Sequence, residues 1–387
     1  MQSLDRFAAD KLAKLDAQLL RRRLVTHARD GIWLEKNGRR LLSFSCNDYL
    51  NLSQHPRVKE AAIAATRQHG VGAGASRLVT GNHPLYAELE SRLAQMKGSA
   101  AACVFGSGYL ANIGIIPTLV GKSGLVLLDE LAHSCLWAGA QLTGGTVLSF
   151  RHNDLAHAET LLAEHRDRHD QALIATDGVF SMDGDLAPLP ALAALARRHD
   201  AWLLTDDAHG LGVVGGGRGS AFAWSERLDI PLQMGTLSKA VGSYGAYLCA
   251  SEPVIDLVKT RARSLIYSTG LPPPTIAAAI AGIDLIARDA ALTALPLNKA
   301  RAFTEAAGLP AAASPIVPIL LGEAARALGA QQALEEEGFL VMAIRPPTVP
   351  AGTARLRLTF TAAHPDAEIA RLAATVREKI LQCPASS

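Results

Sequence analysis

The sequence predicts an α/β fold, with a large domain built on a mostly parallel sheet and a second, smaller α+β domain. Short, continuously apolar runs recur through the middle of the chain, and helical stretches such as residues 110–119 and 189–198 lie between several of them. Runs of this kind are typical of parallel strands that helices cover on both faces. The predicted strands are residues 101–105, 125–128, 147–150, 172–176, 201–205 and 244–250.

The remaining segments suggest how the chain divides into domains. We expect the large domain to span residues 45–285, and the smaller one to combine residues 1–44 with residues 286–387. Apolar residues at helical spacing predict a helix over the first twenty or so positions, packing with the small domain. Residues 355–360 alternate apolar and polar side chains, which predicts a half-exposed strand.

The composition indicates a globular cytoplasmic protein. The chain has 387 residues, of which 49% are hydrophobic, and this is enough for a large buried core. A formal net charge of +2 gives no sign of a nucleic-acid partner. The five cysteines include no C-x-x-C pair, so neither a metal site nor a disulfide framework is expected. The N-terminus lacks the apolar core of a signal peptide, and no apolar stretch is long enough to span a membrane.

A glycine-rich turn at residues 106–111 (GSGYLA) is the strongest candidate for a phosphate site. It follows an apolar run and opens a helical stretch, so its amides can face an anion at the positive end of a helix. Asp129 ends the next apolar run about twenty residues later, as in a dinucleotide-binding fold. A NAD-dependent dehydrogenase is therefore one interpretation, and a tight turn between a closely packed strand and helix is another.

Lys239 stands apart from other charges, because it is the only charged residue between Asp229 and Glu252. Apolar surroundings lower the pKa of a lysine amine and suit it to covalent attachment of a carbonyl group. Asp206 ends another apolar run and His209 follows it closely, at the edge of the sheet where open α/β proteins bind ligands. A lysine, a strand-end carboxylate and a phosphate-binding helix together favour pyridoxal phosphate.

Two further polar residues also follow predicted strands. His133 comes shortly after Asp129, and it can be either a helix cap or a residue lying flat against the cofactor ring. Ser181 follows the run that ends at residue 176, and it belongs either to a plain turn or to the cofactor site. The pattern alone leaves both alternatives open.

Several stretches in order resemble one family, the α-oxoamine synthases. These are pyridoxal-phosphate enzymes with the aspartate-aminotransferase fold, also called fold type I. The most discriminating stretch is IRPPTVPAGTARLRLT at residues 344–359. The others are SCNDYL at 45–50, GNH at 81–83, TDGVFSMDGD at 176–185, DDAHG at 206–210, TLSK at 236–239 and LIYST at 265–269. The resemblance extends over essentially the whole chain.

The resemblance implies roles for residues around the cofactor. Lys239 would attach it and shuttle a proton, Asp206 would pair with its pyridine nitrogen, and His133 would stack on its ring. His209 and Ser181 would address the ring oxygen. The implied phosphate ligands are Gly108, Tyr109 and Thr236, together with Ser268 or Thr269 across a homodimer interface.

The resemblance also implies the substrates and the residues that bind them. Asn47 and Arg357 would bind the carboxylate of the amino acid, and Arg21 and Thr348 the acyl substrate. Within the family, residues 344–350 favour condensation of L-alanine with a pimeloyl thioester, carried by coenzyme A or by acyl carrier protein. The alternatives are a glycine-using ligase or synthase of the same family, the NAD-dependent dehydrogenase, and a non-catalytic binding protein.

Overall fold

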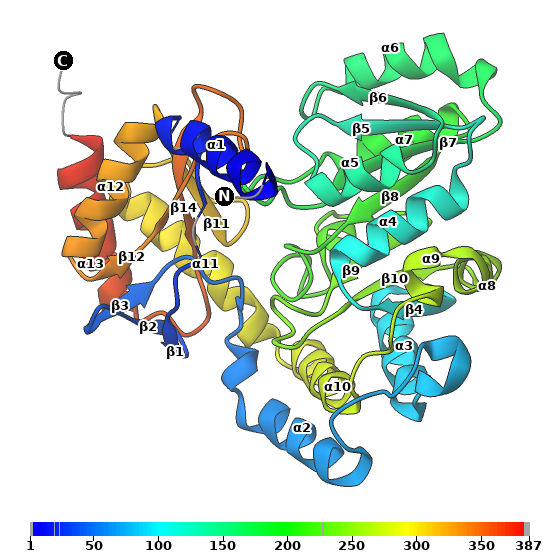
Figure 1. The fold of residues 1–387 in the computed structure, drawn as a ribbon, viewed down its shortest axis with the longest axis horizontal. Helices are drawn as coiled ribbons and strands as arrows, with labels where there is room; N and C mark the ends of the chain where they lie inside the picture. The colour runs from blue at the N-terminus through cyan, green and yellow to red at the C-terminus, as the bar shows by residue number, and fades with distance from the viewer. Residues whose placement is uncertain (1–2, 19, 23, 227, 383–387) are drawn as a thin grey trace. The chain divides into compact units, whose positions relative to one another are not determined.

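The computed structural model describes residues 3–18, 20–22, 24–226 and 228–382. Its internal contacts divide the chain into two units, which we describe separately (Figure 1). The larger unit comprises Asn47–Asn298 and Ala313–Pro315, and the smaller unit comprises Met1–Cys46, Lys299–Ala312 and Ile316–Ser387. The larger unit thus continues to Asn298, past the expected boundary at residue 285, and the division falls within helix α11 (Ala290–Ala307).

A seven-stranded sheet forms the centre of the larger unit, in the order β4-β10-β9-β8-β7-β5-β6. Five neighbouring strands, β9, β8, β7, β5 and β6, are parallel, and only β10 runs against its two neighbours. The expected mostly parallel sheet is therefore confirmed. The strands are β4 (Ala101–Phe105), β5 (Leu125–Asp129), β6 (Thr146–Phe150), β7 (Ala172–Asp177), β8 (Trp202–Asp206), β9 (Leu232–Thr236) and β10 (Ala246–Ala250).

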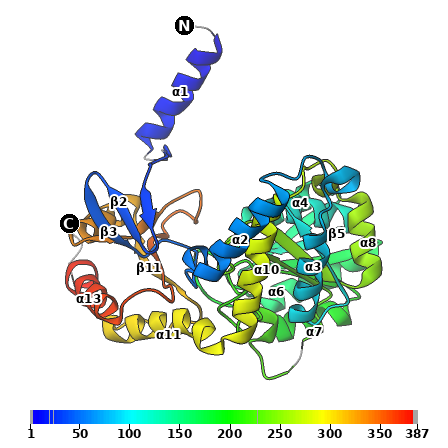
Figure 2. The same ribbon diagram turned by 90° about the horizontal axis from the view of Figure 1, so that it is seen from below.

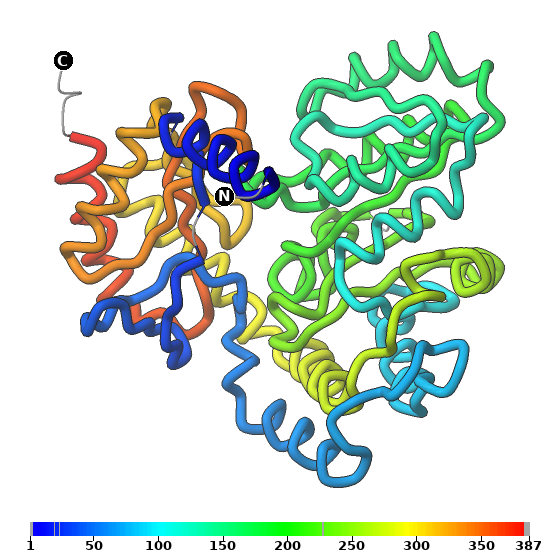
Figure 3. Tube along the Cα trace, viewed as in Figure 1, coloured from blue at the N-terminus to red at the C-terminus, as the bar shows by residue number. Residues whose placement is uncertain are grey.

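Helices lie on both faces of this sheet, and Figure 3 lets the reader follow the chain between strands and helices. Alternate residues of β5 show the reason for its continuous apolar run. Val126 and Leu128 pack in a core with α4, α5 and α8, while Leu125 and Leu127 pack in another with α6 and α7. These helices are α4 (Gly108–Leu119), α5 (Ser134–Gln141), α6 (Leu155–His165), α7 (Leu189–Arg198) and α8 (Glu252–Arg261).

A second group of helices lies side by side in the same unit. Helix α10 (Pro273–Arg288) packs against both α2 (Pro56–His69) and α3 (Pro84–Lys97), as Figure 2 shows. Helix α10 begins at Pro273 in the proline-rich segment 270–274 (GLPPP), because proline is tolerated in the first turn of a helix. The short helix α9 (Arg263–Ile266) connects α8 to this region. None of the described helices is long and apolar enough to cross a membrane.

The smaller unit contains two small sheets, with orders β1-β2-β3-β12 and β11-β14-β13. The expected N-terminal helix is present as α1 (Ser3–Ala17), although none of its residues is buried. The other elements are β1 (Ala28–Asp30), β2 (Trp33–Lys36), β3 (Arg39–Ser43), β11 (Ile316–Gly322), α12 (Ala324–Glu336), β12 (Phe339–Leu340), β13 (Met342–Ile344), β14 (Ala354–Thr359) and α13 (Asp366–Val376).

The prediction of a half-exposed strand at residues 355–360 is wrong. Strand β14 lies between β11 and β13, and all of its residues are buried. Arg355 and Arg357 are only 3% and 6% exposed. The alternation of leucine and arginine therefore separates two buried environments instead of separating core from solvent.

His364 is part of an aromatic cluster in the core of the smaller unit. Its ring stacks on Phe44, with ring centroids 4.0 Å apart. Its Nδ1 accepts the main-chain N–H of Thr361 at 3.0 Å, and its Nε2 donates to the main-chain oxygen of Ser43 at 2.9 Å. Burial lowers the pKa of His364 from 6.5 to about 4.

This histidine should make the protein sensitive to acid. Between pH 6.5 and about 4 the unfolded chain binds a proton at His364 that the folded chain does not bind. The free energy of unfolding therefore falls as the pH decreases through this window, by about 3 kcal/mol from this one group. Urea unfolding near pH 7 and near pH 4.5 should show a smaller acid loss in His364→Gln than in the parent. Equal losses in the two proteins would contradict the assignment.

Candidate active site

Three adjacent parallel strands of the larger unit end in aspartate. Asp129 ends β5, Asp177 ends β7 and Asp206 ends β8, and in the sheet Asp177 pairs directly with Asp206. All three residues are at most 4% exposed. Because the carboxyl ends of parallel strands form the ligand-binding edge of an open α/β sheet, this edge is the candidate active site.

The carboxylate of Asp206 is held from two sides. Its Oδ2 accepts the side-chain amide of Asn112 at 2.8 Å, and its Oδ1 accepts the main-chain N–H of Ala208 at 3.0 Å. Asn112 itself is fully buried on α4. These bonds fix the orientation of a carboxylate that the sequence assigned to a pyridine nitrogen.

Asp177 is the neighbour that sequence analysis did not assign. Burial, together with the nearby charge of Asp206, raises the pKa of Asp177 well above its usual value. Its Oδ2 accepts the main-chain N–H of His133 at 3.0 Å, so it ties the segment after β5 to the end of β7. Asp177 stands inside the stretch 176–185 and ends an apolar run, and these two signals could have identified it.

The structure places His133 as a helix cap at the ligand-binding edge of the sheet. It is the N-cap of α5, where its Nδ1 accepts the main-chain N–H of Cys135 at 3.3 Å and lies 2.8 Å from the Cys135 thiol. Burial raises the pKa of that thiol, so the sulfur keeps its proton. Burial and the charge of Lys239 lower the pKa of His133. The ring is therefore neutral, with Nδ1 as the acceptor and Nε2–H as a donor.

The other residues predicted to contact the ring lie in loops of the same unit. His209 is buried, and its Nδ1 lies 2.6 Å from the hydroxyl of Tyr49. Lys239 follows β9 and is half-buried. Its charge acts to lower the pKa of both His133 and Asp177. Ser181 begins the turn after β7 and is also half-buried. Tyr49, which the sequence analysis did not assign, lies in the motif at 45–50.

The start of α4 has the geometry of a phosphate site. A Cβ built on Gly108 would lie 2.8 Å from Cγ2 of Thr236, so only glycine allows the helix to begin this close to the end of β9. The Oγ1 of Thr236 is buried and has no hydrogen-bond partner among the described residues. Tyr109 is 51% exposed beside it in the chain. An anion at this positive helix end would supply the partner that Thr236 lacks, so the residues fit a bound phosphate.

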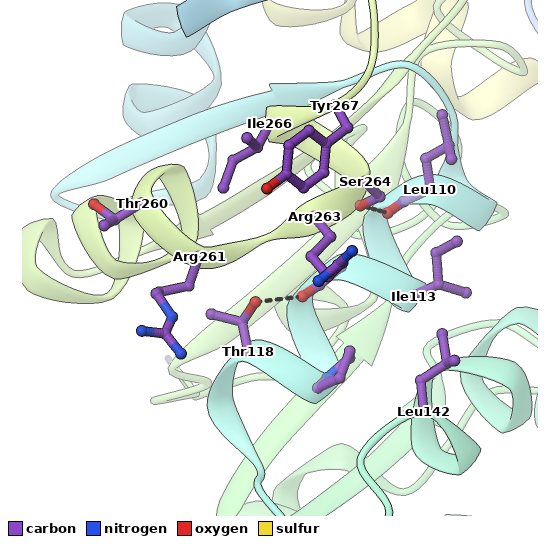
Figure 4. A pocket seen from close by; sticks show the side chains of 12 residues that line it. Leu110, Ile113, Thr118, Leu142, Thr260, Arg261, Arg263, Ser264, Ile266 and Tyr267 are labelled. Atoms are coloured by element: carbon purple, nitrogen blue, oxygen red, sulfur yellow. Dashed lines mark hydrogen bonds between the residues drawn. The ribbon is translucent and has the colours of Figure 1, made fainter.

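Ser268 and Thr269 follow α9 in the chain, directly after Tyr267. Thr269 is exposed and makes an isolated bridge with Ser76. A cavity of 690 Å³ lies along α4 and α9, and its lining includes Leu142 and Tyr267, which are 61% and 74% exposed. Figure 4 shows these side chains around the cavity, with the Ser264 hydroxyl bonded to the main-chain oxygen of Leu110.

The predicted substrate residues are divided between the units. Asn47 begins the larger unit, whereas Arg21, Thr348 and Arg357 belong to the smaller one. Within the smaller unit, Thr348 accepts a hydrogen bond from Arg22 at 2.9 Å, while Arg21 pairs with Asp16 at 2.5 Å.

Asp207 points away from Asp206 into a different environment. It forms a 2.8 Å ion pair with Lys97, and both side chains are at most 1% exposed. Ser220 adds a main-chain hydrogen bond at 3.0 Å. Asp207 thus has a structural role, because it is the buried partner of Lys97 and Ser220.

The geometry disfavours the dinucleotide interpretation. The carboxylate of Asp129, which would bind a ribose, already accepts N–H groups from Leu131, His152 and Asn153. Among the described residues there is also no cluster of three metal-ligating side chains.

Comparisons with known proteins agree with the site. The family model described as aminotransferase class I and II matches residues 39–376. The 8-amino-7-oxononanoate synthase of Beijerinckia indica is 62% identical over 377 residues, which cover 97% of this chain and 98% of that protein.

Two solved structures have a similar fold. Serine palmitoyltransferase from S. paucimobilis, solved with bound PLP–myriocin, aligns with a TM-score of 0.90 and 29% identity, covering 97% of this chain and 98% of that chain. The 8-amino-7-oxononanoate synthase from Francisella tularensis aligns with a TM-score of 0.73 and 25% identity, covering 88% of this chain and 98% of that chain.

The expected fold class, fold type I of the aspartate-aminotransferase kind, is confirmed. Pyridoxal phosphate is accordingly the cofactor, and Asp206, Gly108, Thr236 and Lys239 are the residues whose chemistry fits it. The chain belongs to the class I and II aminotransferase family and, within it, to the pyridoxal-phosphate-dependent 8-amino-7-oxononanoate synthases, which are acyltransferases.

Proposed function

We propose that this enzyme condenses L-alanine with a pimeloyl thioester, carried by coenzyme A or by acyl carrier protein. The products are 8-amino-7-oxononanoate, carbon dioxide and the free thiol carrier, in a step of biotin biosynthesis. The observation that carries this proposal is the identity of 62% to a synthase of that name over nearly the whole chain.

Two residues provide the central chemistry. Bound pyridoxal phosphate supplies an electron sink for the negative charge left on the α-carbon of an amino acid. The Lys239 amine holds the cofactor and then removes and returns the proton at that carbon. The Asp206 carboxylate keeps a proton on the pyridine nitrogen. The side-chain amide of Asn112 fixes the orientation of this carboxylate.

Three other side chains orient the reacting groups. The neutral ring of His133 would lie against the bound cofactor and would offer its Nε2–H to the carbonyl oxygens of the substrates. His209, with its Nδ1 beside the hydroxyl of Tyr49, uses its other nitrogen toward the ring oxygen, together with Ser181. The start of α4 at Gly108 and Tyr109 and the hydroxyl of Thr236 hold the phosphate.

The substrate contacts follow from the motifs. Asn47 and the buried guanidinium of Arg357 bind the carboxylate of alanine, because arginine matches a carboxylate with two parallel hydrogen bonds. Arg21 and Thr348 bind the acyl substrate. The hydrogen bond from Arg22 to Thr348 joins the segment after α1 to the motif at 344–359 within the smaller unit.

Asp206 and the neighbouring Asp207 should respond differently to substitution. Asp206→Asn keeps the shape but removes the charge, and it should slow exchange of the α-hydrogen of alanine by about 10²–10³-fold. Asp207→Asn should exchange that hydrogen near the parent rate. It should instead lower the free energy of unfolding by about 3–5 kcal/mol, because the buried charge of Lys97 loses its partner.

Proton NMR of alanine in deuterium oxide measures the exchange, and urea unfolding measures the stability. Near-parental exchange in Asp206→Asn together with lost exchange in folded Asp207→Asn would show that the catalytic carboxylate is misassigned.

A product assay tests the substrates themselves. Alanine and glycine should each be offered with pimeloyl, acetyl and succinyl thioesters, and the products separated by mass spectrometry. We expect alanine with the pimeloyl thioester to react fastest. A faster reaction of glycine with the acetyl or succinyl thioester would instead identify one of the glycine-using enzymes of the family.

The active form should be a homodimer that uses the face beside Ser268 and Thr269. Tyr267→Asp replaces an exposed aromatic side chain on this face with a charge. It should produce monomers, seen by analytical ultracentrifugation, that retain less cofactor, measured by absorbance. Trp202→Asp is the control, because Trp202 is 38% exposed at the opposite end of a strand, away from the candidate site. A fully active monomer of the parent protein would refute the proposal.

A further inference from the structure

His152 connects two carboxylates at the edge of the candidate site. It follows β6, the edge strand of the seven-stranded sheet. Its Nδ1 lies 3.0 Å from Oδ1 of Asp129, and its Nε2 lies 2.8 Å from Oδ2 of Asp185. The side chain of His152 is 23% exposed and that of Asp129 is fully buried.

On one side, the histidine reaches the segment that carries His133. Asp129 Oδ1, which His152 contacts, also accepts the main-chain N–H of Leu131 at 2.9 Å. The main-chain oxygen of Asp129 accepts the N–H of Ala132, the residue before His133. The position of the ring-stacking histidine therefore depends on the same aspartate that pairs with His152.

On the other side, the histidine reaches the turn that carries Ser181. The main-chain oxygen of Asp185 accepts the N–H of Phe180 at 3.0 Å, which closes the turn around Ser181. The rings of His152 and Phe180 pack edge to face, with centroids 4.4 Å apart and an interplanar angle of 89°. Asn153 adds a side-chain bond to Asp185 at 3.0 Å.

We propose that His152 is a positioning residue of the cofactor site: its imidazolium bridges Asp129 and Asp185 and so holds the segments of His133 and Ser181 in register. The inference rests on the roles proposed above for His133 and Ser181. It does not depend on the identity of the amino acid or of the thioester.

The electrostatics agree with a charged bridge. The hydrogen bonds and charges of Asp129 and Asp185 outweigh the effect of burial and raise the pKa of His152 from 6.5 to about 10. The other charged group at this histidine is Glu130, whose carboxylate accepts its main-chain N–H at 2.9 Å. In a titration of the apoprotein by NMR, His152 should carry protons on both ring nitrogens near pH 8, where an ordinary histidine is neutral. A neutral ring at that pH would overturn the charged bridge.

The variant His152→Gln tests the positioning role. Gln is neutral and cannot reach both carboxylates. Outer partners of metal ligands typically contribute about 10–100-fold to affinity, and we expect a similar rise in the dissociation constant for pyridoxal phosphate. Titration of the apoprotein with pyridoxal phosphate alone measures the affinity, and visible circular dichroism reports the environment of the bound ring. The dichroism of the variant should be weaker than that of the parent.

His169→Gln is the matched control. His169 is also half-buried and bonded at both ring nitrogens, to the main-chain oxygen of His165 and to the hydroxyl of Thr146, each at 2.8 Å. Thr146 begins β6, so this histidine lies at the other end of the same strand. Its variant should keep the parental cofactor affinity and dichroism even if it loses stability.

A second variant decides the matter if His152→Gln does not fold. The Asp185 side chain is 41% exposed, and Asp185→Asn keeps an acceptor oxygen while it removes one of the two charges. Asp185→Asn should also raise the dissociation constant for pyridoxal phosphate, by a smaller factor than His152→Gln. Parental affinity and dichroism in folded His152→Gln, or in Asp185→Asn if only that variant folds, would overturn the proposal. Either result leaves the substrate assignment to the product assay.

Discussion

Three buried carboxyl groups at one edge of a parallel sheet are the constraint on which the rest of the site depends. Asp129, Asp177 and Asp206 are buried at the ends of neighbouring strands, so each of these polar groups needs partners at this edge of the sheet. The three carboxyl groups differ in their hydrogen-bond partners and in their electrostatic surroundings. Asp129 is paired with the imidazole of His152 and accepts two main-chain N–H groups. Asp177 has a raised pKa, which favours its protonated form. Asp206 keeps polar partners and is the carboxylate suited to a cationic ring nitrogen.

The same main-chain features build the fold and the site. His133 caps a helix, and the bond that makes it a cap also fixes the tautomer that leaves its Nε2–H as a donor. Gly108 lets α4 begin against Thr236, and this close packing also brings the helix N-terminus to a buried hydroxyl that lacks a partner. The structural role of each residue is therefore compatible with the role proposed for it at the cofactor, because the same geometry can serve both.

The errors of the sequence analysis have a common physical cause. Strand β9 was not predicted because Gln233 and Gly235 interrupt its apolar pattern, yet it is buried between β8 and β10. Strand β14 was expected to be half-exposed because arginines alternate with leucines, yet both faces are covered. A local pattern reports the polarity of side chains, whereas burial depends on which other elements cover them.

The sequence by itself determined the alternation of strands and helices, the isolated lysine, the strand-end Asp206 and the motifs that identify the family. These signals are local, since each depends on a few neighbouring residues. Only the tertiary structure decided which distant partners meet. Asn112 at Asp206, Tyr49 at His209, and His152 between Asp129 and Asp185 join residues that are far apart in the chain. Hydrogen bonds and desolvation depend on distance in space, and strand order and helix packing set that distance.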